Sequence, residues 1–287
     1  MPPRESAMEK HDIPPPEPAP VGTTRTFRVA NLQAAGYGEV HATLECVSAH
    51  VAMWVAEGVT ASQAGLAASA RAIEERILPV LAQIYPADPL RNIQTYAVLN
   101  LRTSGAAGYY ASMDDGADPG ASPLFVMNLA AVRPGTDAYD SVLAHEIQHV
   151  LQAATDPNEA AWVTEGASQL VQTLAGYPAP LHAVSAFAAA PGLQLNTWSG
   201  DDASVFRHYG ASFLLLQYLY ERYGLSGLEL LLNAPEDGTA ALNRVLGTLD
   251  GSGFRDLYAD WTVANLLDAP ETLNGTGGYA EIDLSIV

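Results

Sequence analysis

Cysteine is almost absent from this chain, and lysine is equally rare. The single cysteine, Cys46, cannot form an intramolecular disulfide, and a cysteine-based zinc site is excluded with it. The only lysine is Lys10, beside twelve arginines. Because Cys46 lies within the apolar stretch "EVHATLECVSAHVAMWV", we expect a buried small hydrophobe there rather than a reactive thiol.

Positive charge is also scarce. The 13 basic residues stand against 32 acidic ones, which gives a formal net charge of −19. Only 16% of the residues are charged, below the roughly 25% that is usual for soluble domains. Such a surface repels nucleic acid and anionic lipid, so neither is an expected partner. No apolar run reaches the roughly eighteen residues that a membrane span needs.

The first 23 residues differ in composition from the rest. The stretch "MPPRESAMEKHDIPPPEPAPVG" lacks the apolar core of a signal peptide and is rich in proline and charge. We therefore expect residues 1–23 to be a disordered leader.

Apolar patterns predict strands first and helices later. Alternation predicts strands in "RTFRVANL" and in "GEVHATLECVSAHVAMWV", with breaks at Gly36, Gly38 and the 48–50 turn. A helix is expected from about Thr60, its N-cap, to the residue before Pro86. "IQTYAVLNL" and "PLFVMNL" are expected strands on either side of a glycine and aspartate loop, "GAAGYYASMDDGADPGAS". Further helices are expected over 137–153, 161–175, 205–223, 226–234, 238–248 and 253–267.

This order of elements predicts an α+β fold. The chain of 287 residues, 48% of them hydrophobic, can bury a core as one large domain or as two lobes that share a cleft. We expect an α+β lobe over 24–155 and a helical lobe over 156–287.

The clearest signal for chemistry is "SVLAHEIQHVLQ", residues 141–152. Thr136 or Asp137 is the expected N-cap of its helix. The apolar face comprises Val142, Leu143, Ile147, Val150 and Leu151. His145 and His149 then project from one face about 6 Å apart along the axis, a spacing at which both rings can bind one zinc ion. Glu146 lies to the side of the pair, where it can act as general base toward a water on the metal.

A catalytic zinc site needs a third protein ligand. Glu165, early in the next expected helix, faces back toward His149 if the two helices pack as a hairpin. Asp156 and Glu159 lie in the intervening turn, where solvated or capping roles are expected, and His182 lies farther along the chain. Glu165 is therefore the predicted third ligand.

These residues carry a family resemblance. "LAHEIQHVLQ" followed by "AAWVTEGASQLVQ" resembles the gluzincin metallopeptidases, the clan that includes thermolysin, and most of all bacterial secreted relatives of hyicolysin and immune inhibitor A. The similarity covers about residues 90–270 and is strongest over 139–177. The interval from the second histidine to Glu165 is shorter than in thermolysin. Ser168 and Gln169 stand where relatives often carry an acidic residue. The resemblance implies a thermolysin-like fold, a secreted protein and Glu165 as the third ligand.

Peptide hydrolysis also requires a donor that stabilises the oxyanion. "VFRHYGASF" offers Arg207, His208 and Tyr209. In gluzincins a downstream tyrosine or histidine has this role, so the resemblance favours Tyr209, with His208 as the alternative. Arg207 is instead a candidate for binding a carboxylate group of the substrate.

Substrates of this clan lie as an added strand along a sheet edge. "SGAAGYYAS" resembles the segment that supplies this edge, with Gly108 allowing close backbone approach and Tyr109 or Tyr110 walling a pocket. An ordinary glycine-rich strand is the alternative. The aspartates of "SMDDGADPGAS" fit no ordered calcium-ligand spacing, so a solvated loop is favoured over a Ca²⁺ site.

The sequence as a whole therefore favours a secreted zinc endopeptidase that acts on protein or peptide substrates. Another zinc hydrolase, such as an amidase or aminopeptidase, is one alternative. A catalytically idle protein that binds a partner in the cleft is the other. The retained Glu146 counts against an idle protein, because a binding module needs no base. The subsite preference and the oligomeric state do not follow from the sequence.

Overall fold

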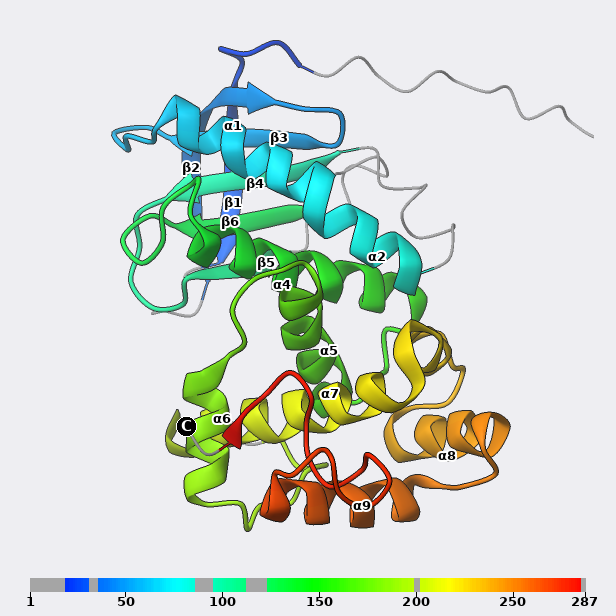
Figure 1. Cartoon of the computed structure of the whole chain (residues 1–287). Helices are drawn as coiled ribbons and strands as arrows, with labels where there is room; N and C mark the ends of the chain where they lie inside the picture. Colours follow the sequence, from blue (N-terminus) through cyan, green and yellow to red (C-terminus); the bar gives the residue numbers. More distant parts are fainter. Residues whose placement is uncertain (1–18, 31–35, 86–94, 112–122, 199–201, 285–287) are drawn as a thin grey trace, which may run out of the picture.

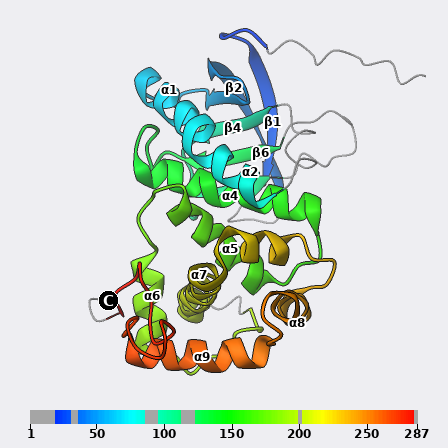
Figure 2. The same cartoon turned by 45° about the vertical axis from the view of Figure 1, so that its right-hand side comes forward.

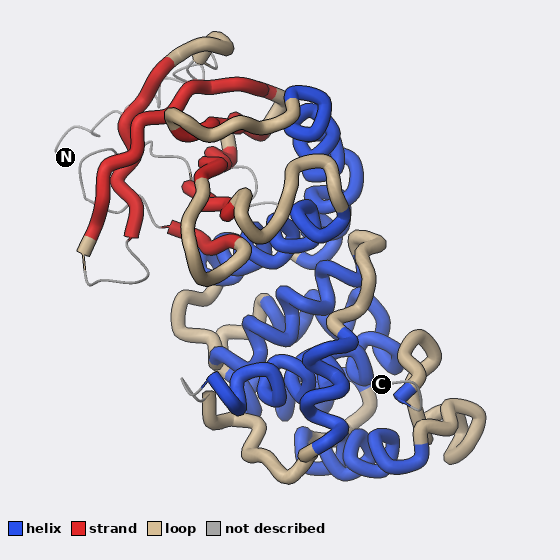
Figure 3. Tube along the Cα trace, turned by 90° about the vertical axis from the view of Figure 1, so that its left-hand side faces the viewer, coloured by secondary structure: helices blue, strands red, loops and turns tan. Residues whose placement is uncertain are grey.

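The computed structural model combines one sheet with a largely helical second half (Figure 1). It describes residues 19–30, 36–85, 95–111, 123–198 and 202–284. Every strand among these residues ends by Asn128, and helices dominate from Asp137 onward. Figure 3 shows the strands at one end of the molecule and most helices at the other. The expected mixture of helix and strand is thus confirmed.

The sheet has six strands in the order β1-β2-β3-β4-β6-β5. They are β1 Thr24–Ala30, β2 Tyr37–Val47, β3 Val51–Ala56, β4 Tyr96–Leu101, β5 Gly108–Ala111 and β6 Leu124–Asn128. The pairs β3–β4 and β4–β6 are parallel, and the remaining pairs are antiparallel. Strands β4 and β6 are buried along their whole length, as the uninterrupted apolar runs "YAVLNL" and "LFVMN" require. Strand β5 is left at one edge.

The sheet is curled around a small core of its own. Side chains from β1, β2, β3, β4 and β6 form a cluster on one face, centred on Phe27, Leu44, Trp54 and Leu99. The Tyr109 hydroxyl on β5 donates to the Ala30 carbonyl on β1 at 3.1 Å, although β1 and β5 are the two outermost strands. The opposite face of the sheet is covered by helices.

The helix between β3 and β4 contains a π-helical segment. It runs as α1 Gln63–Ala72, η1 Ile73–Ile77 and α2 Leu78–Ile84. Its N-cap is Ser62, whose hydroxyl accepts from the Gly65 amide at 3.2 Å, so the prediction of Thr60 was wrong by two residues. Gly65 lies where an added Cβ would stand 2.5 Å from the Pro134 carbonyl oxygen, so the helix packs closely against the loop that precedes helix α4, Asp137–Thr155.

Helix α4 lies between the sheet and the helices that follow it in the chain (Figures 1 and 2). The later helices are α4 Asp137–Thr155, α5 Ala161–Leu174, α6 Leu181–Ala189, α7 Asp202–Leu232, α8 Gly238–Leu249 and α9 Phe254–Leu267. One large hydrophobic cluster extends from β3 and β4 through α4, α5 and α7 to α8 and α9. Within the described ranges, no helix has both the length and the apolar character needed to cross a membrane.

Three local predictions need correction. Gly38 does not break a strand, because it pairs with Val29 inside the β1–β2 ladder. The glycine-rich segment is not all loop, since residues 108–111 form β5. The aspartates for which a solvated loop was favoured over a calcium site lie outside the described residues. Helix α6 was not predicted; it begins after Pro180 without a side-chain cap. The two helices predicted over 205–223 and 226–234 are confirmed: α7 is interrupted at Gly224, whose backbone is non-helical (φ 63°, ψ −162°).

Candidate metal centre

Helix α4 carries the two histidines on the side that faces α5. Its N-cap is Thr136, one of the two predicted, whose side chain accepts from the Tyr139 amide at 3.4 Å. The predicted apolar face is buried at Leu143, Ile147, Val150 and Leu151. Because the helix is fixed through that face, His145 and His149 project to its side and remain 15% and 22% exposed. Their Nε2 atoms are 3.0 Å apart.

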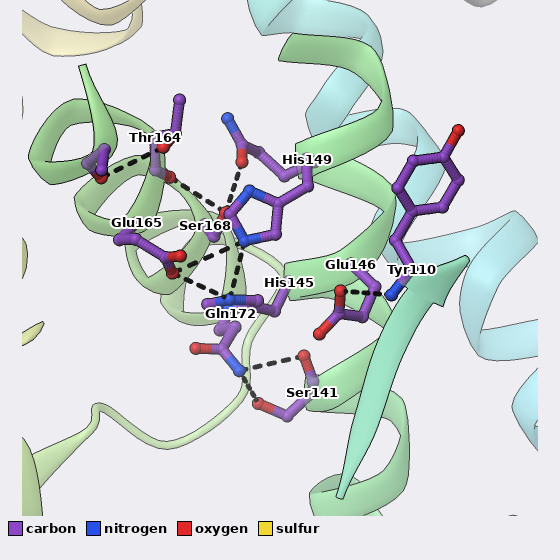
Figure 4. Close-up of polar contacts among 11 residues, drawn as sticks. Tyr110, Ser141, His145, Glu146, His149, Thr164, Glu165, Ser168 and Gln172 are labelled. Carbon is purple, nitrogen blue, oxygen red and sulfur yellow. Dashed lines mark hydrogen bonds and ion pairs between the residues drawn. The ribbon is translucent and has the colours of Figure 1, made fainter. Parts of the chain in front are cut away.

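Helix α5 brings Glu165 to the same point, as the helix-hairpin prediction required. Its Oε2 lies 3.2 Å from Nε2 of His145 and 3.5 Å from Nε2 of His149 (Figure 4). This oxygen is buried and accepts no hydrogen bond of good geometry among the described residues. A buried carboxylate oxygen without such a bond is unfavourable unless another partner compensates it.

The spacing of these three atoms fits one metal ion. Two ligands at about 2.0–2.1 Å from a tetrahedral metal are separated by about 3.3 Å. The observed separations of 3.0, 3.2 and 3.5 Å bracket that value. All three candidate ligand atoms lie within 4.8 Å of one another, and His145, His149 and Glu165 are the one such group among the described residues. The structure therefore contains a group that can hold a metal ion.

The charges within the group are strongly coupled. Burial opposes ionisation of Glu165, but contact with His145 and His149 outweighs it and lowers the pKa of that carboxyl to about 2. Burial likewise opposes protonation of His149, and the charges of Glu165 and Glu146 reverse this and raise the pKa of the imidazole. A carboxylate that stays ionised is the form that binds a metal.

Glu146 lies between the histidine pair and the edge strand β5 (Figure 4). Its Oε2 accepts a hydrogen bond from the Tyr110 amide of β5 at 3.0 Å. Strand β5 can come this close because position 108 is glycine: a Cβ there would stand 2.6 Å from Cγ1 of Val142 and 2.9 Å from Sδ of Met127. The general-base candidate is thus fixed between the histidine pair and an edge strand.

Helix α7 places Tyr209 beside His145. The two ring centroids are 6.5 Å apart, and Trp198 packs edge-on against Tyr209 at 5.1 Å. Burial, reinforced by the charges of Glu165 and Glu146, raises the pKa of Tyr209 well above its ordinary value. The hydroxyl therefore keeps its proton at neutral pH and can act as a donor.

The other predicted residues lie farther from the group or have other partners. The buried His208 ring packs against Trp198 at 5.4 Å. Arg207 donates to the carbonyl oxygens of Ala190 and Gly192, which fixes the segment after α6. His182 packs against the ring of Phe206.

The two acidic residues of the turn between α4 and α5 have local roles. Asp156 is the C-cap of α4 and accepts from the Asn158 amide at 3.0 Å. Glu159 accepts from the amides of Ala160 and Gly238 at 2.6 and 2.7 Å, so it caps the start of α8. Neither carboxylate belongs to the metal group, which agrees with the capping roles expected for this turn.

Sequence reasoning missed the residues that support the group. Ser168 lies 3.4 Å from Nδ1 of His149, and Gln172 of α5 donates to the Ser141 hydroxyl of α4 at 2.8 Å. Trp198 was missed because it precedes α7 in an irregular segment. A helical spacing would have found Ser168 and Gln172, three and seven residues after Glu165, which places them on the same face of α5.

A hollow elsewhere in the molecule is separate from this group. It has a volume of about 560 Å³ and is lined by β1, β2 and the end of β3, with Arg25, Glu45 and Glu57 as its charged residues. It shares no residue with the metal group. No set of three metal ligands converges there among the described residues, so the histidine–glutamate group is the stronger candidate.

Comparisons with known proteins do not extend this assignment. No protein-family model matches the chain, and a search of curated proteins also finds no match. The function must therefore be argued from the geometry of the site and from the sequence motifs.

Proposed function

We propose that the protein is a zinc-dependent endopeptidase of gluzincin type. The observation that carries this proposal is the convergence of His145, His149 and Glu165 on one point, with Glu146 beside them at a sheet edge. Two histidines and one glutamate are a ligand set typical of catalytic zinc, which keeps a position open for water or substrate. When bound, zinc supplies a Lewis acid that lowers the pKa of water to about 7 and polarises a carbonyl.

Glu146 is the proposed general base. One carboxylate oxygen is held by the Tyr110 amide at 3.0 Å, and the other accepts no hydrogen bond in the described part of the chain. The second oxygen can therefore take a proton from the attacking water and later pass it to the leaving amine. The Tyr110 contact orients the carboxylate for both transfers.

Tyr209 is the proposed oxyanion donor, because α7 brings its ring beside the metal group. Its ring lies beside His145, and Trp198 restrains it from behind. A protonated phenol at this place can donate to the oxygen that becomes negative when water adds to a peptide carbonyl. His208, the alternative donor, packs against Trp198.

The edge of β5 is the proposed seat of the substrate. The Asn128 amide donates to the Ala107 carbonyl, so residues 107, 109 and 111 turn their backbone groups toward β6. Gly108 and Tyr110 therefore turn theirs outward, and the bond from the Tyr110 amide to Glu146 shows that this outer edge faces the site. An extended peptide can pair there as an added strand, which fits a protein or peptide substrate.

The resemblance to gluzincins supports the same conclusion. A strand-rich half followed by a helical half, with the metal group near their junction, is the arrangement that a thermolysin-like fold implies. By the same resemblance we propose that the protein acts outside the cell.

The proposal is tested by Glu146→Gln, which keeps the shape of the side chain and removes its basicity. We expect one zinc ion per chain in both proteins, with peptide-library cleavage reduced about 10²- to 10⁴-fold in the variant. Metal analysis and mass-spectrometric digestion assays measure the two quantities.

Each other outcome has a defined meaning. If the wild-type protein binds no zinc, the proposal is refuted. A wild type that binds zinc and cuts no peptide would favour another zinc hydrolase or an idle binding protein. Equal cleavage by both proteins would show that Glu146 is not the base.

A further inference from the structure

A chain of buried hydrogen bonds connects the metal group to the protein core. We call Ser168, Gln148, Tyr85 and Gln152 the polar relay, and it ends at the Leu232 carbonyl. Its four side chains come from α5, α4 and the end of α2, and each is at most 2% exposed. Buried polar groups are costly unless they are paired, and no step of the proposed reaction uses these residues.

At the Leu232 end of the relay, the direction of hydrogen-bond donation is fixed. The Leu232 carbonyl can only accept, so the group of Gln152 that faces it at 3.4 Å is the Nε2 donor. Oε1 of Gln152 must then accept, and the Tyr85 hydroxyl donates to it at 2.8 Å. A hydroxyl has one proton, so the Tyr85 oxygen has only lone pairs left for its other neighbour.

The same reasoning fixes the direction of the hydrogen bonds as far as Ser168. Nε2 of Gln148 donates to the Tyr85 oxygen at 2.7 Å, which turns Oε1 of Gln148 toward Ser168. The Ser168 hydroxyl therefore donates to Gln148, its nearest acceptor; the Thr164 carbonyl, at 3.0 Å, is the other acceptor in reach. With either acceptor, Ser168 has no proton to give to His149.

The ring of His149 must therefore supply the proton in its contact with Ser168. The Ser168 oxygen is 3.4 Å from Nδ1 and 3.5 Å from Nε2, so distance alone does not choose between the two nitrogens. Nε2 also faces His145 and Glu165, whereas Ser168 is the one side-chain partner of Nδ1 in the described part of the chain. We propose that the polar relay positions His149 as the tautomer with its proton on Nδ1, which directs the Nε2 lone pair into the metal group. This inference rests on the proposed role of His149 as a metal ligand. Ser168 acts directly on the ring, and Tyr85 and the two glutamines act through Ser168.

The relay consists only of neutral groups. A metal-ligating histidine usually donates its second N–H to a carboxylate, a backbone carbonyl or water, and this contact orients the ring. Here a serine hydroxyl takes that place, and its lone pairs are oriented by a carbonyl at the far end of three further side chains. A neutral partner adds no negative charge beside the metal group, which already contains Glu165 and Glu146.

The tautomer can be measured in the metal-free protein. Long-range ¹H–¹⁵N correlation spectra at mildly alkaline pH show which ring nitrogen carries the proton, and His149→Ala identifies the signals. We expect the Nδ1–H tautomer to dominate in the wild type and to lose its dominance in Ser168→Ala. An unchanged tautomer in Ser168→Ala would overturn the proposal.

Zinc affinity, measured by competition with a chelator, gives a second readout. We expect Ser168→Ala and Tyr85→Phe to weaken binding about 10- to 100-fold. Tyr139→Phe is the matched control, because Tyr139 is equally buried and its hydroxyl donates to Asn100 at 2.6 Å, outside the relay. Thermal melting shows that each variant is folded.

The outcomes separate this proposal from the proposed function. A loss in Tyr139→Phe as large as that in Tyr85→Phe would show a general effect of stability and contradict the relay. If the wild type binds zinc but cleaves nothing, the affinity measurements still decide the relay. If the wild type binds no zinc, the peptidase proposal fails, and the tautomer spectra alone decide whether Ser168 orients His149.

Discussion

Glu159 and Glu165 flank the start of α5, and the structure gives them different partners. Glu159 accepts from two backbone amides, one of them at the start of α8, whereas Oε2 of Glu165 faces two imidazole nitrogens and accepts no well-formed hydrogen bond among the described residues. Both are partly buried glutamates within one short segment. Their difference in function must therefore arise from position alone, which makes them a matched pair for mutation.

We expect Glu165→Gln to weaken zinc binding on the order of 100-fold and Glu159→Gln to leave it unchanged. A zinc site with four ligands is worth roughly 10–16 kcal/mol, so one ligand contributes about 3 kcal/mol. Glu159→Gln should instead lower the melting temperature, because it weakens a helix cap. Chelator competition and thermal melting measure both variants. Equal zinc affinity in the two would contradict the assigned ligand set.

The core of the site could be predicted at the residue scale because it is local. His145, Glu146 and His149 follow from helical spacing, and Glu165 follows once α4 and α5 are taken as a hairpin. Ser168 and Tyr85 could not be placed in this way, because Tyr85 meets Gln148 across 63 residues of sequence. A contact of that kind is created only when the elements pack.

At the scale of elements, two glycines set how closely the helices approach the site. Gly166 follows Glu165, and a Cβ there would stand 2.7 Å from the Ser212 carbonyl oxygen of α7. Gly210 follows Tyr209, and a Cβ there would overlap the Ala183 carbonyl of α6. Glu165 and Tyr209 are thus each followed by a glycine, which lets α5 pack closely against α7 and α7 pack closely against α6. This close packing allows Glu165 and Tyr209 to lie near the two histidines.

We expect Gly210→Ala to destabilise the protein by about 1–3 kcal/mol, since α6 and α7 must move apart to admit the methyl group. The movement also displaces Tyr209, so cleavage should fall more than zinc affinity. Gly247→Ala is the control: it lies in exposed helix with its nearest neighbour 4.0 Å away, and alanine there should stabilise by up to about 1 kcal/mol. Denaturant unfolding compares the two. A neutral Gly210→Ala would mean that α6 and α7 are not in close contact.

Most helices and strands followed from apolar periodicity, and the misses have physical causes. Helix α6 lacks a side-chain cap and starts after a proline, so its sequence carries no N-terminal signal. The π-helical segment 73–77 keeps helical composition and differs only in its hydrogen bonds. Strand β5 has only four residues, two of them tyrosine, and it becomes a strand by pairing with β6.

At the scale of the whole molecule, the order of elements was predictable and their arrangement was not. The change from alternating to helical patterns near Pro134 separates the sheet from the helical half. The strand order β3-β4-β6-β5 and the curl that brings Tyr109 to Ala30 depend on pairings between distant segments. Local propensity does not encode such pairings. The edge position of β5 was therefore expected from the family resemblance and not from local propensity, and the substrate proposal depends on it.

Contacts of Glu74 join the turn between β2 and β3 to the helix that covers the sheet, so we expect the stability of the whole fold to fall at acidic pH. Glu74, in the π-helical segment, accepts from the Ser48 hydroxyl and the His50 amide and pairs with the His50 ring, each at 2.7 Å. Burial opposes ionisation of Glu74, but these contacts outweigh it and hold the pKa of the carboxyl below its ordinary value of 4.5. A lowered pKa in the folded state stabilises the protein above the unfolded pKa, and this stabilisation is lost as the pH falls through the folded value.

We therefore expect Glu74→Gln to cost on the order of 1 kcal/mol at neutral pH, a modest amount because the pair is partly exposed. The difference from wild type should shrink as the pH falls below about 5, where the wild-type carboxyl also becomes protonated. Glu75→Gln changes the same charge at the exposed neighbouring position and should show no such convergence. Urea unfolding at a series of pH values measures all three proteins. A difference between Glu74→Gln and wild type that stays constant with pH would show that the turn is held by packing and not by the ionised carboxylate.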